Sequence, residues 1–169
     1  MYSDFIEHIL KVCKTLNSCN VEFIIVGGTA AGFHGYNRMT MDPYGLPTSK
    51  HDFDFWFNPN YENYFNILKA MKSLGKDVSR LENESSPNPK KSFLKFEFEE
   101  FKIDFLPEIK GLNSFADSYS NTIKSIIDTI EFRILSLDDL IKTKNMFKLY
   151  KIRLKQVPYK FKLKKKKKI

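Results

Sequence analysis

Several features that would indicate other classes of protein are scarce or missing from this sequence. No run approaches the roughly 18 to 20 uncharged apolar residues that a membrane helix needs. The first residues, MYSDFIEHIL, lack the basic-then-apolar order of a secretory leader. Cysteine is limited to Cys13 and Cys19, without the partners that a zinc site or a disulfide framework requires. We therefore expect a cytoplasmic protein without membrane contact, whose cysteines are reduced, with Cys13 on a buried helix face.

Acidic residues are absent from one end of the chain. Residues 142–169 contain 13 of the 28 Lys and Arg residues and no Asp or Glu, which leaves 15 basic and 20 acidic residues before them, a net charge of −5. The overall charge of +8 therefore belongs to the end of the chain. We predict a folded domain over residues 1–144 and an irregular, Lys-rich tail over 145–169. One hypothesis makes this tail a salt-sensitive anchor for nucleic acid.

Aromatic residues are abundant, with 16 Phe among 169 residues, enough to build the core of one compact domain. The spacing of apolar residues predicts helices at 3–18, 29–34, 64–74 and 136–144, strands at 21–26, 52–57, 92–99, 101–106 and 131–135, and loops at 42–51 and 82–91. The last two strands before residue 107 are close enough for a hairpin. This order predicts an α+β fold: a mixed sheet of about four to six strands, with helices packed mainly on one face.

Three aspartates are placed where strand geometry can bring them together. Alternation in the run DFDFWF puts Asp52 and Asp54 on one face of a strand and phenylalanines on the other, and Asp104 likewise faces away from its apolar neighbours in FKIDFL. Three carboxylates at one site repel one another unless a cation neutralises them. Hard oxygen ligands suit Mg²⁺ or Mn²⁺, and two such ions support in-line phosphoryl transfer. The sequence therefore predicts a two-metal site at Asp52, Asp54 and Asp104.

A diglycine turn precedes these acids. Gly27 and Gly28 follow a buried strand and lead into a helix that begins near Thr29. Glycine lets the backbone approach an anion closely, and the first amides of a helix point outward. We expect this turn to hold the phosphates of a nucleoside triphosphate.

The runs IIVGGTAAGFHGYNRMT, DFDFWFNPNYENYFNILKAMKSLG and KIDFLPEIKGL together resemble the DNA polymerase β type nucleotidyltransferase superfamily over residues 20 to about 144. The resemblance is to small bacterial members, including AbiEii-like toxins and minimal nucleotidyltransferases. It implies that Gly27, Gly28 and Thr29 bind the triphosphate, that Asp52 and Asp54 bind both metals, and that Asp104 completes the site. It also implies an H-G-x-x-R pattern, matched by His34 and Arg38, and a role in a toxin-antitoxin or phage-defence pair with a cognate antitoxin.

Other interpretations of the same residues remain open. Thr29 can simply support the helix, His34 can satisfy a structural hydrogen bond, and Arg38 can pair with a surface acid. Trp56 falls beside the acids, where we expect it to form a wall of the site rather than to stack on a base. The acceptor can be RNA, a protein side chain or a small molecule. The alternative function is a non-catalytic module that binds a nucleotide or nucleic acid on the same fold.

Overall fold

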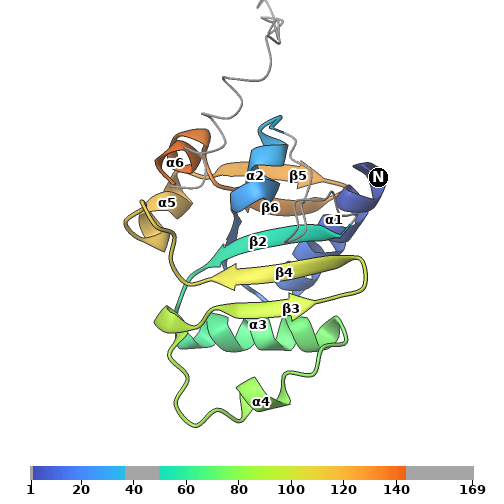
Figure 1. The fold of residues 1–169 in the computed structure, drawn as a ribbon, viewed down its shortest axis with the longest axis vertical. Coiled ribbons are helices and arrows are strands. Elements are labelled where there is room, and N and C mark those ends of the chain that lie inside the picture. The colour runs from blue at the N-terminus through green and yellow to red at the C-terminus, as the bar shows by residue number, and fades with distance from the viewer. Residues whose placement is uncertain (1, 37–49, 144–169) are drawn as a thin grey trace, which may run out of the picture.

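Six strands in the described part of the chain form one mixed sheet. The computed structural model describes residues 2–36 and 50–143. The strands are β1 (Phe23–Ile25), β2 (His51–Phe57), β3 (Leu94–Glu97), β4 (Phe101–Leu106), β5 (Ile123–Ile127) and β6 (Ile130–Ile134), and they lie in the order β3-β4-β2-β1-β6-β5. The pairs β2–β4 and β1–β6 are parallel, whereas the other neighbours are antiparallel (Figure 1). The predicted α+β class is therefore confirmed.

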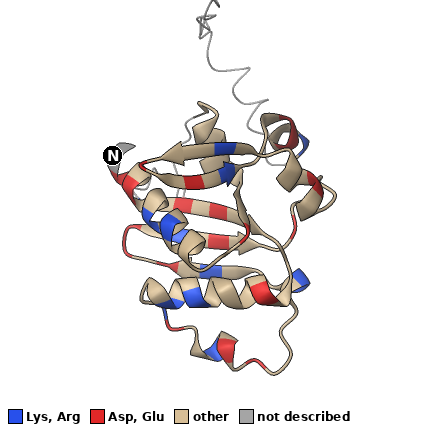
Figure 2. Cartoon of the chain, turned by 180° about the vertical axis from the view of Figure 1, so that it is seen from behind, with Lys and Arg blue, Asp and Glu red and all other residues tan. Residues whose placement is uncertain are grey.

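The two longest helices cover one face of this sheet. The helices α1 (Tyr2–Ser18) and α3 (Tyr61–Ser73) lie behind the strands in Figure 1 and in front of them in Figure 2. Alternation along β2 sends three fully buried phenylalanines toward them, Phe53, Phe55 and Phe57. Cys13 of α1 is buried in the same core, as its sequence position predicts. The opposite face of β2 is thereby left to Asp52 and Asp54.

The other face is covered only in part, by shorter helices. The helix α2 (Gly27–Phe33) crosses in front of the sheet directly after β1. The helix α5 (Phe115–Ser120) packs on β2 through Phe115, whose ring lies 5.6 Å from that of Trp56 in an edge-to-face arrangement. Ser136 caps α6 (Leu137–Lys142) by accepting a hydrogen bond from the backbone N–H of Asp139, the contact that the Ser-Leu-Asp-Asp pattern predicts. Within the described part of the chain, these helices leave the middle of this face of β2 and β4 uncovered (Figure 1).

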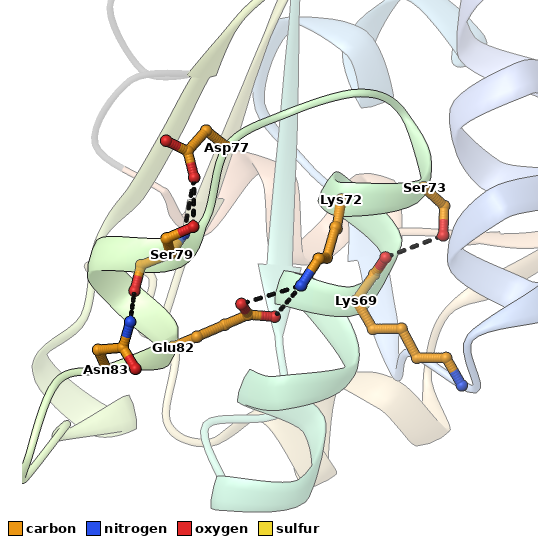
Figure 3. Close-up of polar contacts among 7 residues, drawn as sticks. All are labelled: Lys69, Lys72, Ser73, Asp77, Ser79, Glu82 and Asn83. Carbon is orange, nitrogen blue, oxygen red and sulfur yellow. Dashed lines mark hydrogen bonds and ion pairs between the residues drawn. The ribbon is translucent and has the colours of Figure 1, made fainter.

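A polar network holds the segment after α3 (Figure 3). Lys72 near the end of α3 pairs with Glu82 at 3.1 Å, and Glu82 ends the short helix α4 (Ser79–Glu82). Asp77 accepts hydrogen bonds from both the hydroxyl and the backbone N–H of Ser79. Gly75 makes the left-handed turn, at φ +88°, that the sequence predicts for the end of α3. The chain is thereby led to the start of β3.

Several elements differ from the sequence-based expectations. The short helix α2 begins at Gly27, two residues before the predicted start, and the predicted loop at 82–91 contains the end of α4 and a 3₁₀ turn, Pro89–Lys91. The helix α5 and the edge strand β5 were not predicted. Most of the predicted loop at 42–51, residue Arg38 and the predicted tail at 145–169 lie outside the described residues, so the division of the chain at residue 144 stays a prediction. Among the described helices none has the length and apolar character to cross a bilayer.

Candidate active site

The parallel pairing of β2 with β4 brings the predicted aspartates together. Asp54 is the direct register partner of Asp104, and Asp52 precedes it by two residues on the same face of β2. All three line one open pocket of about 320 Å³, which we call the acidic pocket; its other lining residues are Lys95, Phe96, Glu97 and Lys102. Aspartates separated by about 50 residues of sequence thus share one surface, as the alternation of both strands requires. Figure 2 shows the acidic segments on these middle strands of the sheet.

The electrostatics of the acidic pocket reflect this crowding. Burial and, after it, the nearby charges of Asp104 and Asp52 raise the pKa of Asp54 to about 7, while a hydrogen bond from the backbone N–H of Gly28 opposes the shift. Burial also raises the pKa of Asp104, against the opposing effect of Lys95. Carboxylates in such surroundings gain from a nearby cation, because a cation favours their charged form.

The predicted glycine turn lies against the central aspartate. Gly27 has φ +61°, and a Cβ placed on it would lie 3.0 Å from Cγ of Asp54, which is closer than side chains ordinarily pack. Gly28 donates its N–H to the Asp54 carboxylate, and a Cβ on Gly28 would meet nothing within 4 Å. The turn therefore packs directly against the side chain of Asp54 and leaves open space beside Gly28.

Two further hydrogen bonds fix β2 to this turn. The backbone N–H of Val26 donates to the carbonyl oxygen of Asp54 at 2.9 Å, and the hydroxyl of buried Thr29 donates to the carbonyl oxygen of Asp52 at 2.9 Å. Thr29 in this structure thus holds α2 against the strand that carries both aspartates. Its contact with a triphosphate stays a prediction.

The remaining predicted residues lie in different surroundings. His34 follows the last residue of α2, and its Nε2 lies 2.8 Å from the carbonyl oxygen of Leu135, the kind of structural hydrogen bond that the sequence left open. Gly27 and His34 occupy opposite ends of α2. Arg38 lies outside the described residues. Trp56 is 2% exposed and donates its indole N–H to the carbonyl oxygen of Pro107, so its ring is covered and is not presented to a base.

The donor chemistry of the acidic pocket suits divalent cations. Three carboxylates on adjoining strands offer the hard oxygen ligands that Mg²⁺ and Mn²⁺ prefer, and their mutual repulsion is the feature that a cation relieves. Over residues 2–36 and 50–143, however, no group of three or more His, Cys, Asp or Glu side chains is arranged so that it could hold a metal ion as the side chains stand. One of the three carboxylates, that of Asp104, is paired with the ammonium of Lys95 at 3.6 Å.

Sequence reasoning did not single out the charged residues that surround the aspartates. Lys95 and Glu97 on β3 and Lys102 on β4 all line the acidic pocket. The available signal was the alternation of the hairpin, because the side chains of Leu94 and Phe96 are buried and those of Lys95 and Glu97 are exposed. The missing information was the register, which pairs Lys95 with Asp104.

Comparison with solved structures finds a protein with a similar mixed-sheet fold. No protein-family model matches the sequence, and no curated protein matches it either. A crystal structure from Thermotoga maritima, described as that of "a putative nucleotidyltransferase (TM1012)", is similar with a TM-score of 0.57, at 16% sequence identity, over 92% of this chain and 91% of that one. At this identity the similarity concerns the fold. The chain therefore shares the fold of that protein, a mixed sheet with helices, and in this chain the acidic pocket lies over β2, β3 and β4.

Proposed function

We propose that this protein is a metal-dependent nucleotidyltransferase, which transfers a nucleoside monophosphate from a nucleoside triphosphate to an acceptor hydroxyl and releases pyrophosphate. The observation that carries the proposal is the register pairing of Asp54 with Asp104, with Gly27 and Gly28 packed against Asp54 from the side of β1. Carboxylates and a close-approach glycine turn are the two parts that triphosphate chemistry needs side by side. The likeness to the Thermotoga maritima protein is consistent with this function.

Each residue of the pocket has a role in the proposed reaction. Asp52, Asp54 and Asp104 would hold two Mg²⁺ or Mn²⁺ ions, which when bound neutralise phosphate charge and lower the pKa of an attacking hydroxyl. Gly28 would admit the β and γ phosphates, because a Cβ placed on it meets nothing within 4 Å, while Gly27 lets the turn lie directly against Asp54. Asp104 also orients the acceptor hydroxyl from the β4 side. Thr29 and Arg38 assist phosphate binding in this proposal, and His34 is the least central of the predicted residues because of its bond to Leu135.

The biological setting is a further part of the proposal. The acceptor is a hydroxyl of RNA, of a protein side chain or of a small molecule. The resemblance to AbiEii-like proteins supports a bacterial toxin that acts in a toxin-antitoxin or phage-defence pair and is restrained by a cognate antitoxin.

Label transfer tests the proposed activity. The purified protein is incubated with Mg²⁺ or Mn²⁺, each of the four α-labelled nucleoside triphosphates, and RNA, protein or small-molecule acceptors. We expect label to appear in one acceptor class with the wild type and to disappear with the double variant Asp52→Ala, Asp54→Ala. Asp117→Ala is the matched control, because Asp117 is an exposed aspartate on α5 whose side chain does not line the acidic pocket.

Two outcomes would argue against the enzyme. Absence of transfer by the wild type for every nucleotide and acceptor would reject the proposed reaction. Binding of a nucleoside triphosphate without transfer, measured by equilibrium dialysis, would instead favour the non-catalytic module.

A further inference from the structure

Lys95 lies beside the aspartates of the acidic pocket, a position that the amino-acid sequence alone does not reveal. It lies on β3, an edge strand of the sheet, and is the register partner of Asp104, which in turn is the register partner of Asp54. Lys95, Asp104 and Asp54 therefore form a row across three neighbouring strands, with their side chains on one face of the sheet. The row ends in a cation at the edge strand.

The ammonium of Lys95 lies between two partners. Its Nζ is 3.6 Å from Oδ2 of Asp104 and 4.7 Å from the centre of the Phe93 ring. Phe93 is 47% exposed, and among the described residues it is one of the few large apolar side chains left in solvent. The contact with Lys95 gives this exposed ring a role, because an aromatic face attracts an ammonium group.

The other lysine of the pocket is engaged elsewhere. Nζ of Lys102 lies 3.6 Å from Oε1 of Glu97. Among the residues that the structure describes, the ion pair of Lys95 with Asp104 is the one that reaches any of the three aspartates. Lys102 is therefore a natural comparison for Lys95: it is the register partner of Asp52 and pairs with Glu97, and its charge opposes the rise in the pKa of Asp104 less than that of Lys95 does.

The charge of Lys95 acts on more than its nearest neighbour. It opposes the rise in the pKa of Asp104 and also that of Asp54, so it stabilises the charged form of both carboxylates. This is the same electrostatic effect, smaller in size, that a divalent cation would have on them. A cation bound at Asp104 and the ammonium of Lys95 would repel each other across a few ångströms.

We propose that Lys95 is an internal counter-cation that competes with divalent metal ions for Asp104, and that its ammonium leaves Asp104 for the Phe93 ring when metal binds. The inference rests on the proposed function, because it assigns the metal to these aspartates. Lys95 is a positioning residue: it neutralises the carboxylates in the absence of metal, and it thereby sets the metal concentration at which the acidic pocket becomes occupied.

Metal binding without nucleotide tests this competition in the full-length protein. Mn²⁺ affinity is measured by electron paramagnetic resonance of the free ion, for the wild type, Lys95→Met and Lys95→Arg. We expect Lys95→Met to bind Mn²⁺ about tenfold more tightly, because it removes a unit charge about 4 Å from the aspartate that binds the dication, in partly screened surroundings. Lys95→Arg keeps the charge and should bind Mn²⁺ with nearly the wild-type affinity.

Three controls separate this effect from general changes in the pocket. Lys102→Met should change the affinity less than Lys95→Met, since Lys102 pairs with Glu97 and its charge acts on Asp104 less strongly than that of Lys95. Asp54→Asn should abolish the measured binding, which shows that the signal comes from the acidic pocket. The side chain of Lys95 is 63% exposed, so Lys95→Met should fold normally, and its urea unfolding curve verifies this.

A double-mutant cycle tests the role of the ring. Phe93→Leu should weaken Mn²⁺ binding by about two- to fivefold when Lys95 is present, because the displaced ammonium loses its alternative partner. In the Lys95→Met background, Phe93→Leu should have no effect. An equal effect in both backgrounds would overturn the role of Phe93.

A second measurement uses the wild type alone. Acetylation of lysines, followed by peptide mass analysis, should show Lys95 becoming more reactive on addition of Mn²⁺ while Lys102 stays unchanged.

If Asp54→Asn abolishes Mn²⁺ binding but Lys95→Met leaves the affinity at or below that of the wild type, the competition is overturned and the metal site stands. If neither the wild type nor Lys95→Met binds Mn²⁺, both the metal site and the competition are overturned.

Discussion

The substitution Gly27→Ala should both destabilise the protein and displace Asp54. Gly27 has φ +61°, a conformation that costs an L-residue about 1–2 kcal/mol. The new methyl would also lie 3.0 Å from Cγ and 3.1 Å from Cβ of Asp54, and overpacking of this kind costs at least about 1 kcal/mol. Reduced freedom of the unfolded chain offsets up to about 1 kcal/mol. The net loss of about 2 kcal/mol should lower the melting temperature by about 4–8 °C.

Gly28→Ala is the matched control for this prediction. A Cβ on Gly28 would meet nothing within 4 Å, and Gly28 is not at positive φ, so alanine should leave the stability unchanged or raise it by up to about 1 kcal/mol. Calorimetry of the three proteins at one pH, without metal, measures the difference. A Gly27→Ala protein that melts no lower than Gly28→Ala would refute the close packing of Gly27 on Asp54.

Three further predictions concern the same domain and its tail. Folding raises the pKa of Asp54 from 3.8 to about 7, so the contribution of this group to stability is present at low pH and is lost as the pH rises between these values. The urea midpoint of the metal-free wild type should therefore fall between pH 5 and pH 8, and Asp54→Asn should lessen this fall. An identical fall in both proteins would contradict the prediction. Thr29→Val should cost about 1–2 kcal/mol by removing the hydrogen bond to the carbonyl of Asp52, whereas Thr29→Ser should largely retain it; urea unfolding curves of equal midpoint for both would show that the bond contributes nothing. Deletion of residues 145–169 should abolish salt-sensitive RNA binding in a filter assay, and unchanged binding would reject the tail as a nucleic-acid anchor.

Side-chain alternation carried most of the information about the site. The run DFDFWF has one face of phenylalanine and one of aspartate, so burial of the rings in the core fixed where Asp52 and Asp54 would point. The same argument applied to Asp104 on β4. The placement of all three on one surface followed once the two strands were neighbours, and that pairing is a long-range contact that local spacing does not specify.

The elements that were missed lack such a pattern. The edge strand β5 has the sequence IKSII, and Ile123 and Ile126 are 48% and 67% exposed, so its apolar residues do not mark one buried face. The helix α5 is six residues long and buries little beyond Phe115 and Ser118, too few positions for a helical period to be recognised. The pairing of Lys95 with Asp104 depends on the register of the β3–β4 hairpin, which no single residue in either strand reveals.

The placement of Trp56 has a practical consequence. It is the only tryptophan of the chain, it lies two residues beyond Asp54 on the same strand, and its indole is enclosed between β2 and Phe115. Its intrinsic fluorescence should therefore report on this region alone, with the short-wavelength emission of an indole shielded from water. A change in the packing around Trp56 on ligand binding can thus be sought optically in the unmodified protein, without an attached dye.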